Sequence, residues 1–261
     1  MSDFYHHSKE RTHGELDRQL DRSFTLAGFS AKQRLALSCR YLADEGHAKT
    51  LAGQVTLRAD TPGTFWTTHF GSGFADVCVS NLVRVDADMN VIEGEGMANP
   101  AVRFHLWIYR ARPDVNSIVH THAVHSAALS MTRARLLVAH MDTTVFHEDC
   151  AYLEDWPGVP VANEEGRLIT EALGSARSIL LSNHGLLTVG SSIDEAVYLA
   201  GLFEHAARLH LLACATGAQI ATLSAPRAQE AHDFLLKPKM ISQTVDYWLR
   251  QAARRHPDAL R

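Results

Sequence analysis

Two histidines separated by a single residue are the most informative feature of this sequence. They are His120 and His122, within the apolar stretch Ile118-Val-His-Thr-His-Ala-Val-His125. Side chains alternate between the two faces of a β-strand, so a strand here would place both imidazoles on one face and close together. Paired imidazoles are natural nitrogen ligands of a divalent metal ion. His125 falls on the other face or in a following helix, so we do not count it as a ligand.

A third ligand would have to come from elsewhere in the chain, and His184 is the best candidate. It ends the apolar stretch Ser178-Ile-Leu-Leu-Ser-Asn-His184, which predicts a buried strand, and it precedes Gly185, where a backbone can approach a site closely. A histidine in such a strand is also compatible with an ordinary hydrogen-bonded core residue. The spacing alone therefore leaves both a metal site and a structural role open.

The elements that would position these histidines are helices and strands in mixed order. Ser30 and Ser192 each begin a capping box, and Asn99 with Pro100 begins a third helix. Strands are predicted at residues 54–58, 64–69, 81–86, 116–122, 178–184 and 186–190, and helices at residues 30–46, 99–112, 163–174 and 192–215. This order favours α/β/α layers around a central sheet over a doubly wound nucleotide-binding fold, and no Gly-x-Gly-x-x-Gly or P-loop motif is present.

Composition indicates a soluble protein with a single domain over residues 1–261. Its polar N-terminal arm would extend to about residue 25, and an amphipathic helical tail would begin at about residue 225. A net charge of -4 argues against nucleic acid and anionic membrane partners. The four cysteines are scattered, as in reduced cytoplasmic proteins, and no apolar segment is long enough to cross a membrane. We expect a cytoplasmic location and a small-molecule partner.

Several motifs taken together resemble the class II aldolase/adducin family. The resemblance covers residues 28–225 and rests on three matches: Arg112-Pro-Asp leading into Val119-His-Thr-His122, Asn183-His-Gly-Leu186, and Ser192-Ile-Asp-Glu-Ala196. It implies a three-layer α/β/α sandwich around a central, mainly antiparallel sheet, and a homotetramer. It also implies a divalent metal ion, zinc first with manganese, iron or cobalt as alternatives, held by His120, His122 and His184. In such enzymes the ion stabilises an enediolate formed when a carbon–carbon bond breaks.

The sequence departs from the family's sugar-phosphate aldolases where they bind phosphate and transfer protons. Ala101 stands where those enzymes have a glutamate, so that acid/base group is missing. The two phosphate-binding serines are replaced by Asn99 and Pro100, a strand asparagine by Gln54, and an anion-binding Thr-Gly turn by Phe70-Gly71. These changes predict a non-phosphorylated substrate, with Gln54, Gly71 and Asn99 as candidate contacts.

Replacements for the missing proton-transfer group are sought in residues 140–152, which are rich in titratable side chains. His147, Glu148 and Tyr152 are the candidates if this segment folds over the site, although a solvated loop is equally compatible with its composition. Arg103 is a candidate ligand for a substrate carboxylate, and a surface salt bridge is the alternative. Aromatic residues on neighbouring strands could line an aromatic-substrate pocket or simply pack in the core: Phe65, Trp66, Phe70 and Phe74.

The sequence therefore predicts a divalent-metal-dependent carbon–carbon lyase acting on a small hydroxy- or oxo-acid. Aldol-type cleavage and decarboxylation of an aromatic hydroxy-acid both remain open, and decarboxylation needs no base to remove a substrate hydroxyl proton. A non-haem iron oxygenase is a third alternative, because three histidines with open coordination positions resemble oxygenase sites. A non-catalytic interaction module of the adducin type is the fourth, although adducin itself lacks the metal-binding histidines.

Overall fold

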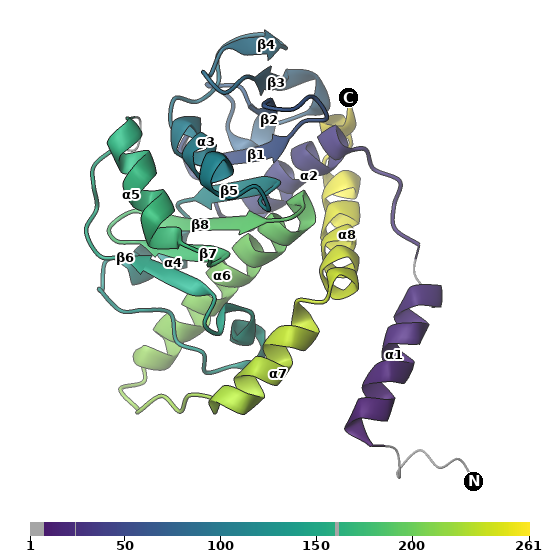
Figure 1. The fold of residues 1–261 in the computed structure, drawn as a ribbon, viewed down its shortest axis with the longest axis vertical. Coiled ribbons are helices and arrows are strands. Elements are labelled where there is room, and N and C mark those ends of the chain that lie inside the picture. The colour runs from purple at the N-terminus through teal and green to yellow at the C-terminus, as the bar shows by residue number, and fades with distance from the viewer. Residues whose placement is uncertain (1–7, 24, 160–161) are drawn as a thin grey trace.

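The computed structural model describes residues 8–23, 25–159 and 162–261 (Figure 1). In these residues eight strands form one sheet, in the order β4-β3-β2-β1-β5-β8-β7-β6. Every neighbouring pair is antiparallel except β6 and β7, which run parallel. The strands are β1 (Gln54–Arg58), β2 (Phe65–Thr68), β3 (Leu82–Val85), β4 (Val91–Glu93), β5 (Ser117–Thr121), β6 (Cys150–Leu153), β7 (Ser178–Leu181) and β8 (Gly185–Gly190).

Helices cover both faces of this sheet (Figure 1). One face packs against α2 (Ala31–Asp44), α6 (Ile193–Cys214) and α8 (Pro238–Arg255). The other packs against α3 (Val102–Ala111) and α5 (Asn163–Leu173). The predicted three-layer α/β/α sandwich with a mainly antiparallel sheet is confirmed. The remaining described α-helices are α1 (Lys9–Ser23), α4 (Val124–Ser130) and α7 (Ala225–Leu235).

Burial on both faces explains why the central strands are apolar at nearly every position. Ile118 packs with α3 and α5, whereas its neighbour Val119 packs with α2 and α6. Adjacent side chains of a strand point to opposite faces, and here each face meets a helical layer, so neither residue is exposed to solvent. By the same alternation His120 points to the face of Ile118, where its ring lies edge-on to Phe104 of α3.

Two helices begin at the predicted N-cap serines: α2 follows Ser30, and α6 follows Ser192, whose side chain accepts from the Glu195 N–H. The Ser30 side chain accepts from the Gln33 backbone N–H, and the Gln33 side chain accepts from the Ser30 N–H, as the capping box at the start of α2 predicts. Asn99 was placed too early as a helix start. Its Oδ1 accepts from the Ala101 N–H in a turn, and α3 begins at Val102.

The C-terminal tail forms α7 and α8, and α8 covers the core with Ile241, Val245 and Leu249. Tyr247 of the same helix is exposed. Within the expected N-terminal arm, α1 lies beside α7, where Lys9 forms an ion pair with Glu230. No described helix is both long and apolar enough to span a lipid bilayer.

Candidate metal centre

His120 is fixed in the interior by β5. The strand is paired on both sides, with His120 opposite Gln54 of β1 and Leu187 of β8. The His120 side chain is almost fully buried, and its Nδ1 lies 2.8 Å from the carbonyl oxygen of Leu186. A carbonyl oxygen only accepts, so Nδ1 carries the proton and Nε2 keeps its lone pair. The free lone pair points away from the backbone toward the other histidines, as expected for a metal ligand.

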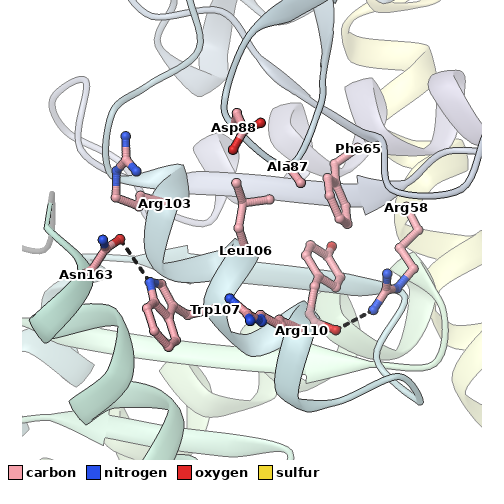
Figure 2. A pocket seen from close by; sticks show the side chains of 10 residues that line it. Arg58, Phe65, Ala87, Asp88, Arg103, Leu106, Trp107, Arg110 and Asn163 are labelled. Carbon is pink, nitrogen blue, oxygen red and sulfur yellow. Dashed lines mark hydrogen bonds between the residues drawn. The ribbon is translucent and has the colours of Figure 1, made fainter.

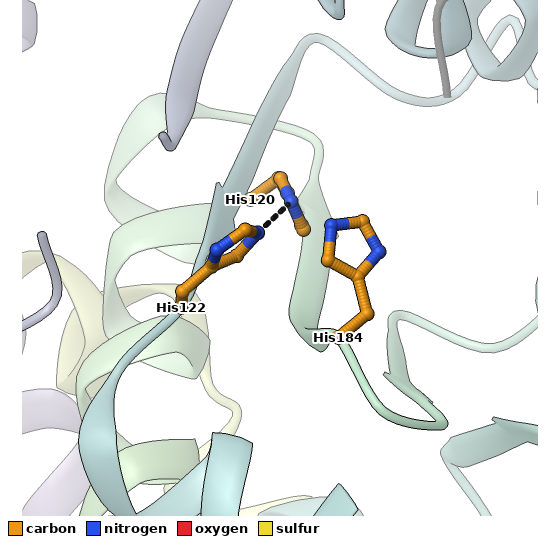
Figure 3. A group of neighbouring side chains, drawn as sticks. All are labelled: His120, His122 and His184. Carbon is orange, nitrogen blue, oxygen red and sulfur yellow. Dashed lines mark hydrogen bonds between the residues drawn. The ribbon is translucent and has the colours of Figure 1, made fainter. Parts of the chain in front are cut away.

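The three predicted histidines converge (Figure 3). The Nε2 atoms of His120 and His122 are 3.1 Å apart. The ring centroid of His184 lies 4.7 Å from that of His120 and 4.6 Å from that of His122. One ring nitrogen from each of the three lies within 4.8 Å of the other two, which is the separation that a single bound cation can bridge.

A hairpin between β7 and β8 brings His184 to the other two histidines. The predicted strand over 178–184 ends at Leu181, so His184 lies in the turn that follows, together with Asn183 at a φ of 55°. The next residue is Gly185, which lies against β5. A Cβ atom there would be 2.4 Å from the Thr121 carbonyl oxygen and 3.1 Å from Cδ2 of His122, so only glycine permits this approach.

Burial keeps the three imidazoles neutral. It is the main cause that lowers the pKa of His120 well below its ordinary value, and the neighbouring His184 and His122 lower it further. Burial likewise lowers the pKa of His122, and burial followed by the nearby His122 lowers the pKa of His184 to about 4. Neutral imidazole is the form that binds metal ions. The donor set therefore fits a divalent cation.

The histidines open into a cavity of about 540 Å³. No lysine, arginine, aspartate or glutamate is among the described residues that line it. The lining consists of Thr50, Leu51, Ala52, Gln54, Phe70, Asn99, Pro100, Ala101, His120, His122, Val159 and His184. The Trp156 ring adds an aromatic surface close by, 6.1 Å from that of His184 between centroids.

Comparison with known proteins agrees with this geometry. The family model described as "Class II Aldolase and Adducin N-terminal domain" matches residues 33–211. The chain belongs to the class II aldolase and adducin family.

Two curated relatives in this family are each 34% identical to the chain over 190 residues. "Decarboxylase NovR" of Streptomyces niveus is matched over 71% of this chain and 70% of its own length. "4-hydroxy-3-prenylphenylpyruvate oxygenase/4-hydroxy-3-prenylbenzoate synthase" of Streptomyces roseochromogenus subsp. oscitans is matched over 71% and 69%. Among solved structures, L-fuculose 1-phosphate aldolase from Glaciozyma antarctica PI12 superimposes with a TM-score of 0.82 at 29% identity, covering 88% of this chain and 92% of the aldolase.

Two of the substrate contacts predicted for this class II aldolase family member lie in the histidine cavity. Gln54 lines it from β1 and is almost fully buried; its Oε1 has no hydrogen-bond partner in the described residues. Asn99 also lines it, although its side chain is engaged with the Ala101 N–H and with the Leu51 carbonyl oxygen. Gly71 is not in the lining but follows Phe70, which is.

Arg103 lines a different cavity, of about 510 Å³, on the outer side of α3 (Figure 2). Arg58 and Arg110 share that lining, and the Trp107 indole donates to Oδ1 of Asn163 there. Arg103 lies on the outward side of the helix, because α3 buries Phe104 and Ile108 against the sheet. The structure therefore does not bring Arg103 to the histidines.

The three proton-transfer candidates also lie outside the lining of this chain's cavity. Residues Met141–Phe146 form a 3-10 helix, η4, that packs on α7 and α6 instead of folding over the histidines. His147 and Glu148 follow η4, and Glu148 is exposed. Tyr152 lies on β6 with its hydroxyl 3.3 Å from Oγ of Ser182. Catalytic roles for these residues stay predictions.

Sequence reasoning missed several residues of the cavity wall. Thr50, Leu51 and Ala52 precede β1, and Val159 lies in the segment before α5. None of them carries a titratable group or lies in a periodic segment, so the sequence offered no signal for them. Of the four aromatic candidates only Phe70 lines the cavity, while Phe65 and Phe74 are buried in the two core clusters.

Proposed function

We propose that the protein is a divalent-metal-dependent lyase that removes carbon dioxide from a non-phosphorylated oxo- or hydroxy-acid with an apolar or aromatic group. One observation carries the proposal: three neutral histidines converge on a cavity with no cationic or carboxylate side chain in its described lining. His120, His122 and His184 would hold the ion. Once bound, the ion supplies a Lewis acid for oxygen donors and for the negative charge that develops as the carbon–carbon bond breaks.

The residues in place of the aldolase acid/base support decarboxylation over aldol cleavage. Aldol cleavage requires removal of a hydroxyl proton, and Ala101 in the cavity wall has no group that could take it. Loss of carbon dioxide requires only that the released electron pair reach an oxygen. This holds directly for a carboxylate β to a carbonyl, and the carbon then takes a proton from water or from a residue of a neighbouring subunit in the proposed homotetramer. For a carboxylate ortho to a phenolic hydroxyl, the same source protonates the ring carbon first, so that the bond breaks in a β-oxo acid tautomer and the electron pair reaches the carbonyl oxygen.

The cavity lining supports a substrate with an apolar body and without a phosphate. Phosphate sites use arginine, lysine or a cradle of backbone N–H groups, and no cationic side chain is in the described lining. Leu51, Phe70 and Val159 instead offer apolar surface. The Gln54 amide would orient a polar group of the substrate, because its buried oxygen has no partner among the described residues.

A second candidate is an iron-dependent oxygenase that acts on an aryl-substituted 2-oxo acid. The observation that favours it is the 34% identity to a protein named as a prenylphenylpyruvate oxygenase, combined with an all-histidine donor set. The two candidates differ in their need for oxygen. A decarboxylase releases carbon dioxide under anaerobic conditions, whereas the oxygenase requires molecular oxygen and Fe(II).

Metal analysis followed by a substrate panel tests the proposal. Purified protein should contain close to one divalent ion per chain, and His122→Ala should lose at least 90% of it, about a tenfold effect or more. The panel comprises 3-oxo acids, ortho-hydroxybenzoates and arylpyruvates, assayed for carbon dioxide with and without oxygen. Aldehyde release in place of carbon dioxide, strong competitive inhibition by inorganic phosphate, or full metal content in His122→Ala would each overturn the proposal.

A further inference from the structure

Strand pairing does not hold the backbone of His122, because this residue lies just beyond the end of the β5–β8 ladder. The β5–β8 ladder ends at Thr121 opposite Leu186, and α4 begins at Val124. His120 is held within the ladder, and His184 lies in the tight turn between two paired strands. The position of His122 therefore depends on what fixes the residues on either side of it.

We propose that Glu204 is a positioning residue that fixes His122 in its metal-binding position by holding the start of α4; this inference rests on the proposed metal centre. Glu204 lies on α6, and its side chain is only 12% exposed. Its Oε1 accepts from the His125 backbone N–H at 2.8 Å, and its Oε2 accepts from the Ser126 backbone N–H at 2.9 Å. The same Oε1 lies 2.7 Å from Nδ1 of His125.

These contacts replace a missing helix cap. The first N–H groups of a helix have no partner within the helix and are normally satisfied by the side chain of the N-cap residue. The N-cap of α4 is Ala123, which has no such side chain. Glu204 supplies both acceptors from another helix, and its negative charge is favourable at a helix N-terminus. One carboxylate thus fixes the chain three residues after His122.

A second contact fixes the chain immediately before His122. Nδ1 of His47 lies 2.9 Å from Oγ1 of Thr121, and both side chains are fully buried. Thr121 lies between the two ligands and points to the opposite face of the sheet. His47 and Glu204 therefore hold the His122 segment from the side away from the cavity. Partners of this kind, which orient metal ligands without touching the metal, commonly affect metal affinity by about 10- to 100-fold.

The test compares two carboxylates of α6 in the metal-free full chain. Glu204→Gln removes one of the two acceptors. Glu195→Gln is the matched control. Glu195 is 13% exposed, pairs with Arg177 and accepts from the Ser191 N–H, far along α6 from Glu204.

The affinity for Co²⁺ is measured by titration, following the visible absorption of the bound ion, and the unfolding midpoints of both variants are measured in parallel. We expect Glu204→Gln to weaken Co²⁺ binding 10- to 100-fold with a changed absorption band. Glu195→Gln should lower the midpoint but leave the affinity within about twofold.

Equal Co²⁺ affinities in Glu204→Gln and wild type, or equal losses in both variants, would overturn the inference while leaving the metal centre intact. A wild-type chain that binds no Co²⁺ would overturn the metal centre and this inference together. Should Glu204→Gln fail to fold, Glu204→Asp decides the question, because it keeps the charge but shortens the side chain that reaches the His125 and Ser126 N–H groups. Several-fold weaker Co²⁺ binding in that variant supports the inference, and unchanged binding overturns it.

Discussion

The Gln54 amide is the polar group that the cavity leaves most available to a substrate. Its oxygen is buried beside His120 of the neighbouring strand and has no hydrogen-bond partner in the part of the chain that the structure describes. Replacing it in Gln54→Leu removes an unsatisfied acceptor, so the free energy of unfolding should stay equal or rise by about 1 kcal/mol. The same change should lower kcat/KM about 10- to 100-fold, because a hydrogen bond to the substrate is lost.

The combination of unchanged or higher stability with lower turnover is the decisive feature of this variant. Kinetics, metal content and chemical denaturation are measured on the same preparation. Metal content should not change, because Gln54 is not among the clustered ligands. A fall in stability with unchanged kcat/KM would assign the amide to the fold and exclude it from substrate binding.

The buried imidazole of His105 makes the stability of the fold depend on pH. It is fully buried on α3, its Nδ1 lies 2.9 Å from Oγ1 of Thr56, and burial lowers its pKa to about 3. In the unfolded chain the His105 imidazole has its ordinary pKa of 6.5 and binds a proton below that pH. In the folded chain it stays neutral until the pH approaches 3. Stability is therefore fully present above pH 6.5 and is lost as the pH falls toward 3. Because of this residue alone, the free energy of unfolding at pH 5 should be lower than at pH 8 by up to about 2 kcal/mol.

His105→Gln tests this dependence, because glutamine does not titrate in this range. Urea unfolding at pH 8 and pH 5 is compared between the variant and the wild type, both free of metal. The variant should show a smaller loss of stability between the two pH values, whatever its stability at pH 8. An identical loss in both proteins would show that other groups, such as the similarly buried His47, dominate the acid sensitivity.

At the scale of elements, the close approach of β8 to β5 depends on Gly185. Gly190 is a matched position at the other end of β8: a Cβ there would be 2.6 Å from the Ala196 backbone nitrogen. Gly185→Ala and Gly190→Ala should each lower the free energy of unfolding by about 1–3 kcal/mol through overpacking. Only Gly185→Ala should also weaken metal binding, because its Cβ would crowd His122. Equal metal affinities in the two variants would contradict this role for Gly185.

The sequence predicted those site residues whose positions follow from the geometry of a single strand or turn. It missed those whose positions depend on how helices and loops pack against one another. The pair His120 and His122 was readable because a strand has a strict period of two residues. Gly185 was readable as a point of close approach. Arg103 was predicted as a substrate contact, but the spacing of Phe104 and Ile108 turns it to the outer side of α3, where it lines a different cavity. The path of residues 141–146 depends on docking against α7, a contact between segments far apart in the sequence.

At the scale of the whole molecule, the opening of the histidine cavity has an apolar rim. Leu51, Phe70 and Val159 line the cavity and are substantially exposed, with Phe70 at 44%. Exposed apolar groups around one opening are typical of surfaces that another chain covers. This agrees with the proposed homotetramer, in which a neighbouring subunit would close the cavity and could supply the carboxylic proton donor that the described lining lacks.

Sedimentation of two variants tests whether this rim is an assembly surface. Phe70→Glu introduces a charge at the rim and should raise the dissociation constant of the proposed tetramer by about 10-fold or more, because an unpaired charge would be buried. Ile92→Glu is the control, since Ile92 is 46% exposed on the edge strand β4 and does not line the cavity. It should leave the assembly unchanged. A wild-type monomer, or equal dissociation of both variants, would show that the rim serves the substrate alone, and the missing proton would then have to come from water.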